Sequence, residues 1–440
     1  MISVPQLLLL VLITIGGITA AFLTDTPFAV GFLPGLACLI ILARRTGSGW
    51  ESLRAAAFDG MRGLIEVVWI LLLLGLLVPA WTASGTIPYM VDLGLRWLNP
   101  DFFIVSAFVI TGLVSMILGS ALGTLSSIGI ALMGAAGIVG VSQPLIAGAL
   151  ISGALLGDRT SPFSSINQLT ADSIGLPKSD HIRAIFPTTL IAFLAAAAAF
   201  TGFDWFQGGA GGHVILTSHM KQYFFMTPLL LIPPIFLIGA ILFRWTTRNA
   251  LIGGLMIAVF LGTILQDLGT AQWASYLIFG YSGDPAVLQG KGLIGMLALV
   301  IFVLLTGAFN GILRETGFLD PYIRNILGTG GLGASTLRAG GFAILLSMVT
   351  CNQALPVMIS GNSLAGPWIE RFSVKDLSRV VADTSVVFPM LVPWNMFAIL
   401  SGKIIGVPSE SYTPYAFFAL GLPVATLCLS FLRERIQRTG

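Results

Sequence analysis

Long apolar runs, separated by short polar stretches, follow one another through the whole chain. These runs lie at 5–23, 27–43, 63–83, 102–119, 121–140, 143–157, 183–202, 223–243, 250–265, 292–311, 339–370, 384–402 and 413–432. A membrane helix needs about 20 apolar residues, so the pattern predicts roughly ten to thirteen hydrophobic segments, some too short to cross. We therefore expect an all-α, polytopic membrane protein whose single integral domain covers residues 1–440.

Two of the apolar runs are interrupted by polar residues and prolines. The first interruption, Asp158 to Ser165, contains Pro162, and the second, Asp383 to Asn395, contains Pro389 and Pro393. Proline removes a backbone donor and disfavours helix at the residue before it. Irregular backbone at membrane depth is tolerated only inside protein or beside a wet cavity. Two broken helices in corresponding halves of a chain are typical of a transporter's binding site.

Basic residues are distributed unevenly between the two faces of the predicted membrane path. Of the 22 Lys and Arg residues, 17 fall in loops that one consistent path places in the cytoplasm, and four fall on the opposite face. The cytoplasmic stretches are 44–62, 176–183, 244–249, 312–338, 371–379 and 433–440. The positive-inside rule then predicts a multi-pass protein of the plasma membrane, of the bacterial inner-membrane type, with both termini cytoplasmic.

The same path makes 102–140 and 339–370 re-entrant hairpins that enter from opposite sides. The stretch 81–89 also recurs loosely as 313–322, and each copy precedes a hairpin and then a broken helix. Similar spacing with opposite orientation is typical of inverted-repeat secondary transporters. We expect repeat one at about 63–202 and repeat two at about 292–432.

Composition removes several classes of protein. The chain is 56% hydrophobic and 9% charged, with a net charge of +3, and it has no basic run with interleaved aromatic residues, so nucleic-acid binding is not expected. Cys38, Cys351 and Cys428 lie far apart, and the three His residues show no ligand spacing. No catalytic or phosphate-binding motif is present, so we expect neither an enzyme nor a cofactor beyond a coupling ion, H+ or Na+.

Polar residues gather at the interruptions and at the two predicted hairpin tips. Hard cations such as Na+ prefer carboxylate, hydroxyl, amide and carbonyl oxygens. Candidate ligands for an ion or substrate are Asp158, Ser161, Ser164, Asn167 and Thr124 in the first half, and Asn352, Gln353, Asp383, Thr384 and Asn395 in the second. The alternative is that these groups only hydrogen-bond neighbouring helices to one another.

Asp158 and Asp383 are the candidates for coupling and for a Na+ site. A buried carboxylate can bind a proton or a cation, and competition between the two is a physical basis for antiport. Arg159 directly follows Asp158, but adjacent residues on a helix do not face each other. We therefore expect Asp158 and Arg159 each to find a partner elsewhere in the chain.

Three blocks of sequence form a specific combination. They are Ser120–Thr124 leading to Ile151–Ser164; Ser378–Thr384; and Pro393–Asn395 followed by Gly406–Pro408 and Tyr412–Phe417. The combination resembles the NhaC-type Na+/H+ antiporter family of the ion-transporter superfamily, whose members are inverted-repeat carriers with opposed hairpins. Where the family pattern continues with an Asp and two Thr, this chain has Ser165, Ile166 and Asn167. Ala382 also replaces a usual carboxylate, so the resemblance implies a less anionic site that binds Na+ more weakly.

We therefore expect a secondary active transporter, a Na+ (cation)/H+ antiporter of the NhaC type, whose partners are the lipid bilayer and a small ion or small-molecule cargo. One alternative is an H+- or Na+-coupled transporter of a small organic solute, a carboxylate or an amino acid. Another is a non-transporting membrane scaffold. The acids in the two broken helices argue against it, because a scaffold does not require buried charges there. A homodimer is compatible with the sequence.

Overall fold

The computed structural model describes residues 4–24, 26–97, 99–207, 223–283, 292–318 and 327–439. Two of the four basic residues on the predicted non-cytoplasmic face are Lys221 and Lys291, and both lie outside these ranges. So do Arg324, in the predicted cytoplasmic stretch 312–338, and residues 319–322 of the second repeat motif. The described residues are helical and contain no strand. Nine of their helices are long and apolar enough to cross a membrane. The predicted all-α, polytopic class is confirmed.

The helices of the first half are α1 (Val4–Leu23), α2 (Phe28–Arg45), α3 (Trp50–Arg62), α4 (Ile65–Ala83), α5 (Thr86–Trp97), α6 (Phe103–Leu118), α7 (Ala121–Thr124), the π-helical turn η2 (Leu125–Gly129), α8 (Ile130–Val139), α9 (Gln143–Thr160), α10 (Ser165–Ile174) and α11 (Lys178–Gln207). Those of the second half are α13 (Ile232–Leu242), α14 (Thr247–Leu265), α15 (Thr270–Phe279), α16 (Ile294–Thr316), α18 (Leu332–Thr350), α19 (Ala354–Ile369), α20 (Val374–Thr384), α21 (Phe388–Leu391), α22 (Met396–Ile405), α23 (Ser409–Tyr412) and α24 (Phe417–Thr439).

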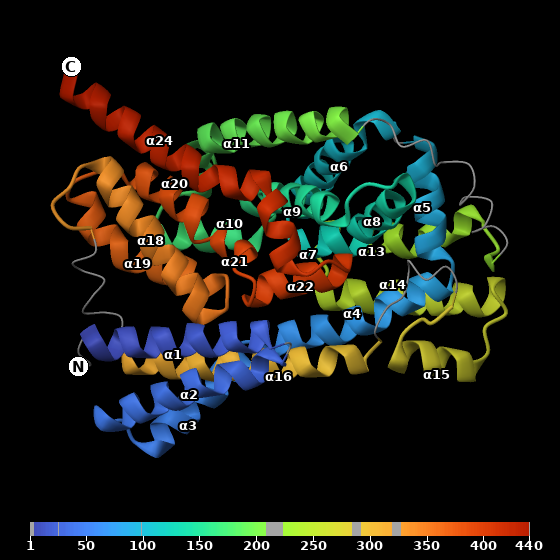
Figure 1. Ribbon diagram of the computed structural model, residues 1–440, viewed down its shortest axis with the longest axis horizontal. Coiled ribbons are helices and arrows are strands. Elements are labelled where there is room, and N and C mark those ends of the chain that lie inside the picture. The colour runs from blue at the N-terminus through green and yellow to red at the C-terminus, as the bar shows by residue number, and fades with distance from the viewer. Residues whose placement is uncertain are drawn as a thin grey trace.

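The helices pack into two groups that lie one above the other in Figure 1. The lower group contains α1 to α4 and α14 to α16, with α16 packed along α2, α3 and α4. The upper group contains α6 to α11 and α18 to α24. The helix α5 packs on both α4 and α8 and so joins the groups. All the ligand candidates belong to the upper group.

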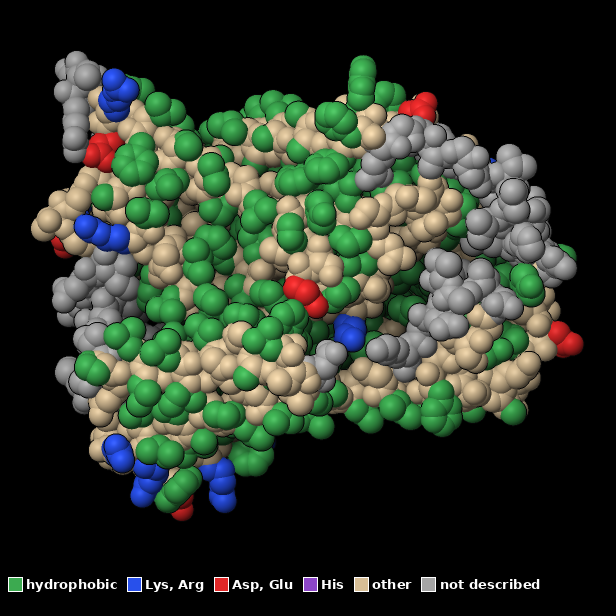
Figure 2. Space-filling model, in the orientation of Figure 1, with side chains coloured by type: hydrophobic (Ala, Val, Ile, Leu, Met, Phe, Trp, Pro, Cys, Tyr) green, Lys and Arg blue, Asp and Glu red, His purple; other side chains and the backbone are tan. Residues whose placement is uncertain are grey.

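Large apolar side chains cover the outer faces of both groups. Leu12, Leu194 and Phe260, on α1, α11 and α14, are each more than half exposed. Figure 2 shows hydrophobic side chains spread over most of one face, with the charged side chains mainly near its two ends. An outer surface of this kind is stable only against lipid, which agrees with the predicted membrane environment.

A seam of small residues holds α9 against α6. A Cβ atom placed on Gly157 would lie 2.0 Å from the backbone carbon of Ser115, and one on Gly153 would lie 2.6 Å from the Phe108 carbonyl oxygen. The Ser115 hydroxyl donates a hydrogen bond to the Ala154 carbonyl at 2.5 Å across the same seam. Glycines thus let the two backbones touch, and this contact fixes the end of α9 where Asp158 lies.

We expect Gly157→Ala to lower the thermal stability of the purified protein. The added methyl group meets backbone rather than a flexible side chain, so the helices must separate, at a cost of about 1–3 kcal/mol. Gly202→Ala on α11 is the matched control, because a Cβ there meets nothing within 4 Å. Thermal unfolding in detergent measures both variants. An unchanged melting temperature for Gly157→Ala would contradict the seam.

The structure contains the predicted interruptions and tips. The helix α6 ends at Gly119, which has a left-handed φ of 68°, and Ser120 then caps α7 by accepting from the Gly123 N–H at 3.1 Å. The helix α18 ends at Cys351, whose φ is 50°. The α20–α21 segment and α22 meet at a bend of 57°. Breaks therefore occur where proline, glycine and polar residues interrupt the apolar pattern.

The two predicted hairpins differ in their packing. The helices α18 and α19 contact each other directly, whereas α6 packs mainly on α9 and α11, and α8 mainly on α5. The glycine seam holds α6 closely against α9 instead. In Figure 1, α18 and α19 lie at the end of the molecule opposite to α5 and α8. The membrane side from which each hairpin enters stays a prediction.

Candidate ion-binding site

Asp158 lies in the last turn of α9 and is 6% exposed. Its Oδ1 accepts a hydrogen bond from the Ala121 N–H at 3.4 Å, at the first residue of α7. Because α7, η2 and α8 form one continuous helix of 19 residues, the carboxylate sits at the positive end of that helix dipole. The Gln353 side chain lies beside the same carboxylate. Residues from three separated segments therefore meet at Asp158.

One oxygen of the Asp158 carboxylate is available to accept a further ligand. Its Oδ2 is buried and has no hydrogen-bond partner among the described residues. Within those residues, no Lys or Arg forms an ion pair with it. A buried carboxylate without a counter-charge is unfavourable, and binding of a proton or a cation removes that penalty.

Asp383, in contrast, is paired with Arg159, and both side chains are fully buried. The guanidinium also donates to the Thr188 hydroxyl at 3.3 Å, to the Thr189 hydroxyl, and to the Ala382 carbonyl at 3.4 Å. The expectation that Arg159 pairs with a residue other than Asp158 is confirmed, and the partner comes from the second half of the chain. The ion pair thus neutralises one of the two candidate acids, and the other has no ion-pair partner among the residues that the structure describes.

The pair also sets how near the two acids lie to each other. Arg159 directly follows Asp158, and its side chain reaches Asp383. Chain geometry therefore keeps the two carboxylates within about 15 Å. They are neighbours at one site. The Oδ2 atom of each carboxylate is buried without a hydrogen-bond partner among the described residues, but Asp383 has a paired cation and Asp158 has none there.

Three predicted ligands in the first half hold the α9–α10 break together. The Ser164 hydroxyl caps α10 by accepting from the Asn167 N–H at 3.2 Å. The Ser161 hydroxyl accepts from the Phe163 N–H, and the Ser161 carbonyl accepts from the Asn167 side-chain amide at 3.0 Å. The Asn167 Oδ1 atom is buried and has no partner within the described chain. Asn167 is therefore the member of this trio with an oxygen to offer an ion.

In the second half, two predicted ligands are used by the backbone of the hairpin tip. The Asn352 Oδ1 atom accepts from the Ala354 N–H at 2.7 Å. The Asn395 Oδ1 atom accepts from the Phe397 N–H at 3.0 Å and so caps α22, while its amide donates to the Ser347 carbonyl at 3.0 Å. Both side chains therefore shape the break, because their carbonyl oxygens already accept from the backbone.

The three remaining candidate ligands, Gln353, Thr124 and Thr384, differ in the groups that their side chains contact. Gln353 donates to the Val386 carbonyl at 3.0 Å and still lies beside Asp158, so it links the hairpin tip to both broken helices. The hydroxyls of Thr124 and Thr384 donate to carbonyls of their own helices, at 2.8 and 2.6 Å. Gln353 is thus the one of these three whose side chain lies beside Asp158.

The sequence reading missed three polar residues of this region. Thr188 and Thr189 hold Arg159, and the adjacent hydroxyls just after Pro187 in an apolar run were the available signal. Asn310 on α16 donates to the Thr350 carbonyl at 2.8 Å, and its buried Oδ1 has no partner in the described residues. A lone Asn inside a 23-residue apolar helix was its signal. It connects the lower helix group to the second hairpin tip.

Comparison with known proteins assigns the family. The Na+/H+ antiporter family matches residues 153–432, which include both helix breaks and both acids. The chain belongs to this family. The predicted NhaC-type resemblance is thereby confirmed, and with it the class of secondary transporters.

Relatives of this Na+/H+ antiporter family member cover nearly the whole chain. It is 26% identical over 417 residues to the Na+/H+ antiporter NhaC of Alkalihalophilus pseudofirmus, covering 91% of this chain and 90% of the relative. It is 27% identical over 408 residues to NhaC of Bacillus subtilis, covering 88% of each. It is also 27% identical over 417 residues to the arginine/ornithine antiporter ArcD of Halobacterium salinarum, covering 90% and 85%.

Proposed function

We propose that this protein exchanges a small monovalent cation, Na+ first among them, for protons, and that both ions compete for Asp158. The observation that carries the proposal is the state of this side chain: buried, at the positive end of a helix, with one unpartnered oxygen and no basic partner among the described residues. A carboxylate in that position binds either ion but not both at once, so loading one releases the other. The NhaC relatives, named as Na+/H+ antiporters, support the same assignment.

The neighbouring polar groups take distinct roles in this proposal. Gln353 and the free Asn167 oxygen supply neutral oxygen ligands, which hard cations accept. Arg159 is the permanent counter-ion of Asp383, so Asp383 shapes the site rather than holding the cargo. The single Asp158 carboxylate then binds one monovalent cation at a time, H+ or Na+, and either cation neutralises its negative charge.

Ser165 bears on the strength of cation binding. It begins α10 directly after the capping Ser164, and it is exposed, whereas Asp158 and Asn167 are buried. An acid at this position would add a negative charge near the break without contacting the buried carboxylate directly. We propose that Ser165 weakens Na+ binding relative to the family pattern because the negative charge of that acid is missing. This effect acts over a distance, and solvent screens it.

A transport assay tests the proposed exchange. Purified protein in proteoliposomes is given an outward H+ gradient and, in separate runs, external Na+, Li+, K+ or a small carboxylate or amino acid, while internal pH is recorded. We expect Na+ or Li+ to drive proton movement that saturates with cation concentration. If neither Na+ nor Li+ nor K+ drove proton movement, the proposal would be refuted. Movement with an organic solute alone would favour the alternative of a solute transporter.

The membrane orientation is a second part of the proposal. We propose that both termini are cytoplasmic and that residues 63–202 and 292–432 are inverted repeats, because basic residues concentrate on one side of the path. The apolar outer surface and the nine candidate spans within the described residues support a multi-pass arrangement. Alkaline phosphatase fused after Gly440 should be inactive in intact cells, and an active fusion would reverse the orientation.

A further inference from the structure

The lower helix group reaches the second hairpin tip through a buried polar side chain, Asn310 on α16. Its amide donates a hydrogen bond to the Thr350 carbonyl at 2.8 Å. Thr350 is the last residue of α18 and belongs to the upper group. The tip continues through Cys351 to Gln353, which lies beside Asp158. A residue of the other helix group therefore contacts the segment that carries one of the proposed ion ligands.

The part of α16 that carries Asn310 is fixed within the lower group. Gly307 and Gly311, on either side of Asn310 in the sequence, let the backbone of α16 touch that of α3. A Cβ atom on Gly311 would lie 2.0 Å from the Ala56 carbonyl oxygen, and one on Gly307 would lie 2.9 Å from the Gly60 carbonyl oxygen. Backbones in such close contact hold the two helices in one relative position. Asn310 thus projects from a rigid support.

The tip that Asn310 contacts contains a strained residue. Cys351 has a φ of 50°, in the left-handed region that residues other than glycine rarely adopt. Such a conformation persists only where the surrounding contacts impose it. The Thr350 carbonyl before it accepts from Asn310, and the Cys351 carbonyl accepts from the Met396 N–H at 3.1 Å. The net contribution of one hydrogen bond and the cost of this conformation are of the same order, so each of these bonds affects whether the tip keeps its shape.

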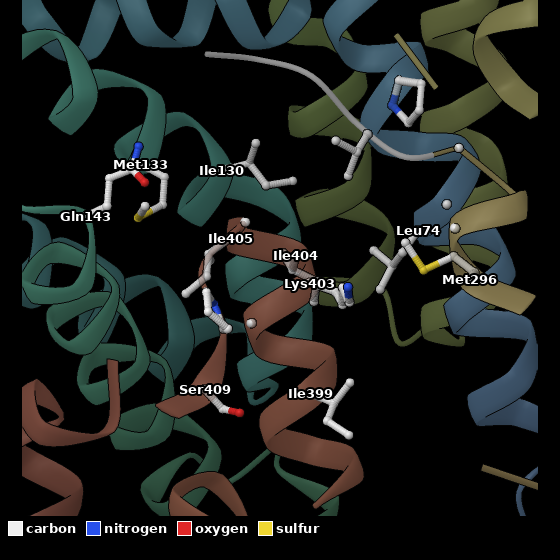
Figure 3. Close-up of a pocket in the computed structure, with 18 of the residues that line it drawn as sticks. Leu74, Ile130, Met133, Gln143, Met296, Ile399, Lys403, Ile404, Ile405 and Ser409 are labelled. Carbon is white, nitrogen blue, oxygen red and sulfur yellow. The ribbon is translucent and has the colours of Figure 1, made fainter. Parts of the chain in front are cut away.

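A cavity of about 640 Å³ separates the two helix groups elsewhere along their boundary. Leu74 and Met296 line it from the lower group, and Ile130 and Ile399 line it from the upper group, as Figure 3 shows. Side chains do not fill this part of the boundary, so packing there does not fix one group against the other. The position of the tip relative to the lower group therefore depends on direct contacts such as the one from Asn310.

We propose that Asn310 is a positioning residue for the exchange at Asp158. It holds the strained tip at Cys351 and so keeps Gln353 beside the carboxylate. This inference rests on the proposed function, because it takes Gln353 as a neutral ligand of the cation. The rest of the Asn310 side chain supports it: the buried Oδ1 atom has no partner among the described residues, and a half-satisfied carboxamide in an apolar helix contributes little to stability.

A capping role for Asn310 makes a different prediction. Its amide also satisfies a terminal carbonyl of α18, a group that has no partner within its own helix. If that were its whole contribution, its removal would lower the stability of the protein and leave both the burial of the tip and the affinity for cations unchanged. The accessibility of the tip and the KM for Na+ therefore separate the two roles.

Alkylation of Cys351 reports on the tip without requiring transport. Its thiol is fully buried, and in a Cys38→Ser/Cys428→Ser background it is the one cysteine left in the chain. We expect Asn310→Ala, and Asn310→Leu as a variant that fills the space better, to label with N-ethylmaleimide about fivefold faster, the factor for losing one hydrogen bond. Thr306→Val is the matched control, because the Thr306 hydroxyl bonds within α16. Unchanged labelling rates in the folded Asn310 variants would overturn the proposal.

Transport kinetics in proteoliposomes give the second readout. With Gln353 displaced, the apparent KM for Na+ in Asn310→Ala should rise about fivefold, while the rate at saturating Na+ stays within about twofold of the wild-type rate. Thr306→Val should keep the wild-type KM. A lower rate at every Na+ concentration with an unchanged KM would refute the positioning role. Absence of Na+-driven exchange in the wild-type protein would instead refute the proposed function, and the labelling rates would still decide whether Asn310 holds the tip.

Discussion

Replacing Asp158 by Asn should abolish the exchange of cations for protons. The substitution keeps the shape of the side chain, and the Asn oxygen can still accept from the Ala121 N–H, but an amide neither takes up a proton nor offers a negative charge. We expect coupled flux in proteoliposomes to fall by at least about 100-fold, the effect of losing the one ion-binding charge of the site. Size-exclusion chromatography and thermal unfolding establish that the variant is folded.

The pH dependence of the wild-type protein gives a second readout of the same residue. If H+ and Na+ compete for Asp158, the apparent KM for Na+ rises as pH falls, by up to about tenfold per pH unit once the protonated form dominates. Asp172→Asn on the neighbouring α10 is the control, because Asp172 is exposed, and it should keep both flux and pH dependence. Wild-type flux in Asp158→Asn, with normal folding, would contradict the assignment of Asp158.

Removing either member of the Arg159–Asp383 pair should destabilise the protein strongly. Both side chains are fully buried, so Arg159→Gln leaves a carboxylate, and Asp383→Asn leaves a guanidinium, without its counter-charge. Such losses cost about 3–5 kcal/mol, because an unpaired charge remains in a low-dielectric site. The double variant Arg159→Gln/Asp383→Asn removes both charges and should recover most of that stability. Thermal unfolding of all four proteins in one detergent measures the cycle.

The exposed pair Arg314–Asp59 is the control for this cycle. Its atoms are 3.8 Å apart and its side chains are 66% and 70% exposed, so Arg314→Gln should change stability by less than about 1 kcal/mol. Full stability of both buried single variants would show that the Arg159–Asp383 contact contributes nothing. A double variant no more stable than the singles would show that hydrogen bonds to Thr188 and Thr189, rather than the charge, are the important contacts.

The sequence alone determined the fold class and the positions of the breaks. Hydropathy predicts membrane helices because each helix satisfies its own backbone, so no distant partner needs to be known. Proline and polar residues predict where those helices stop for the same local reason, and the structure has its breaks at Gly119–Ser120, Ser161–Ser164 and Val392–Asn395. The blocks around Asp158 and Asp383 were likewise sufficient to indicate the family, since they are contiguous in the chain.

Only the tertiary structure decided what each polar residue does. Arg159 and Asp383 are separated by 224 positions, and nothing local shows that their side chains meet while Asp158 has no ion-pair partner among the described residues. Asn352, Ser164 and Asn395 have the chemistry of ion ligands, yet their oxygens accept from nearby backbone N–H groups. A cavity lined by residues of α4, α16 and α22 also arises where the two helix groups meet. A pairing depends on the orientation of side chains across helices, and spacing along one chain leaves that orientation open.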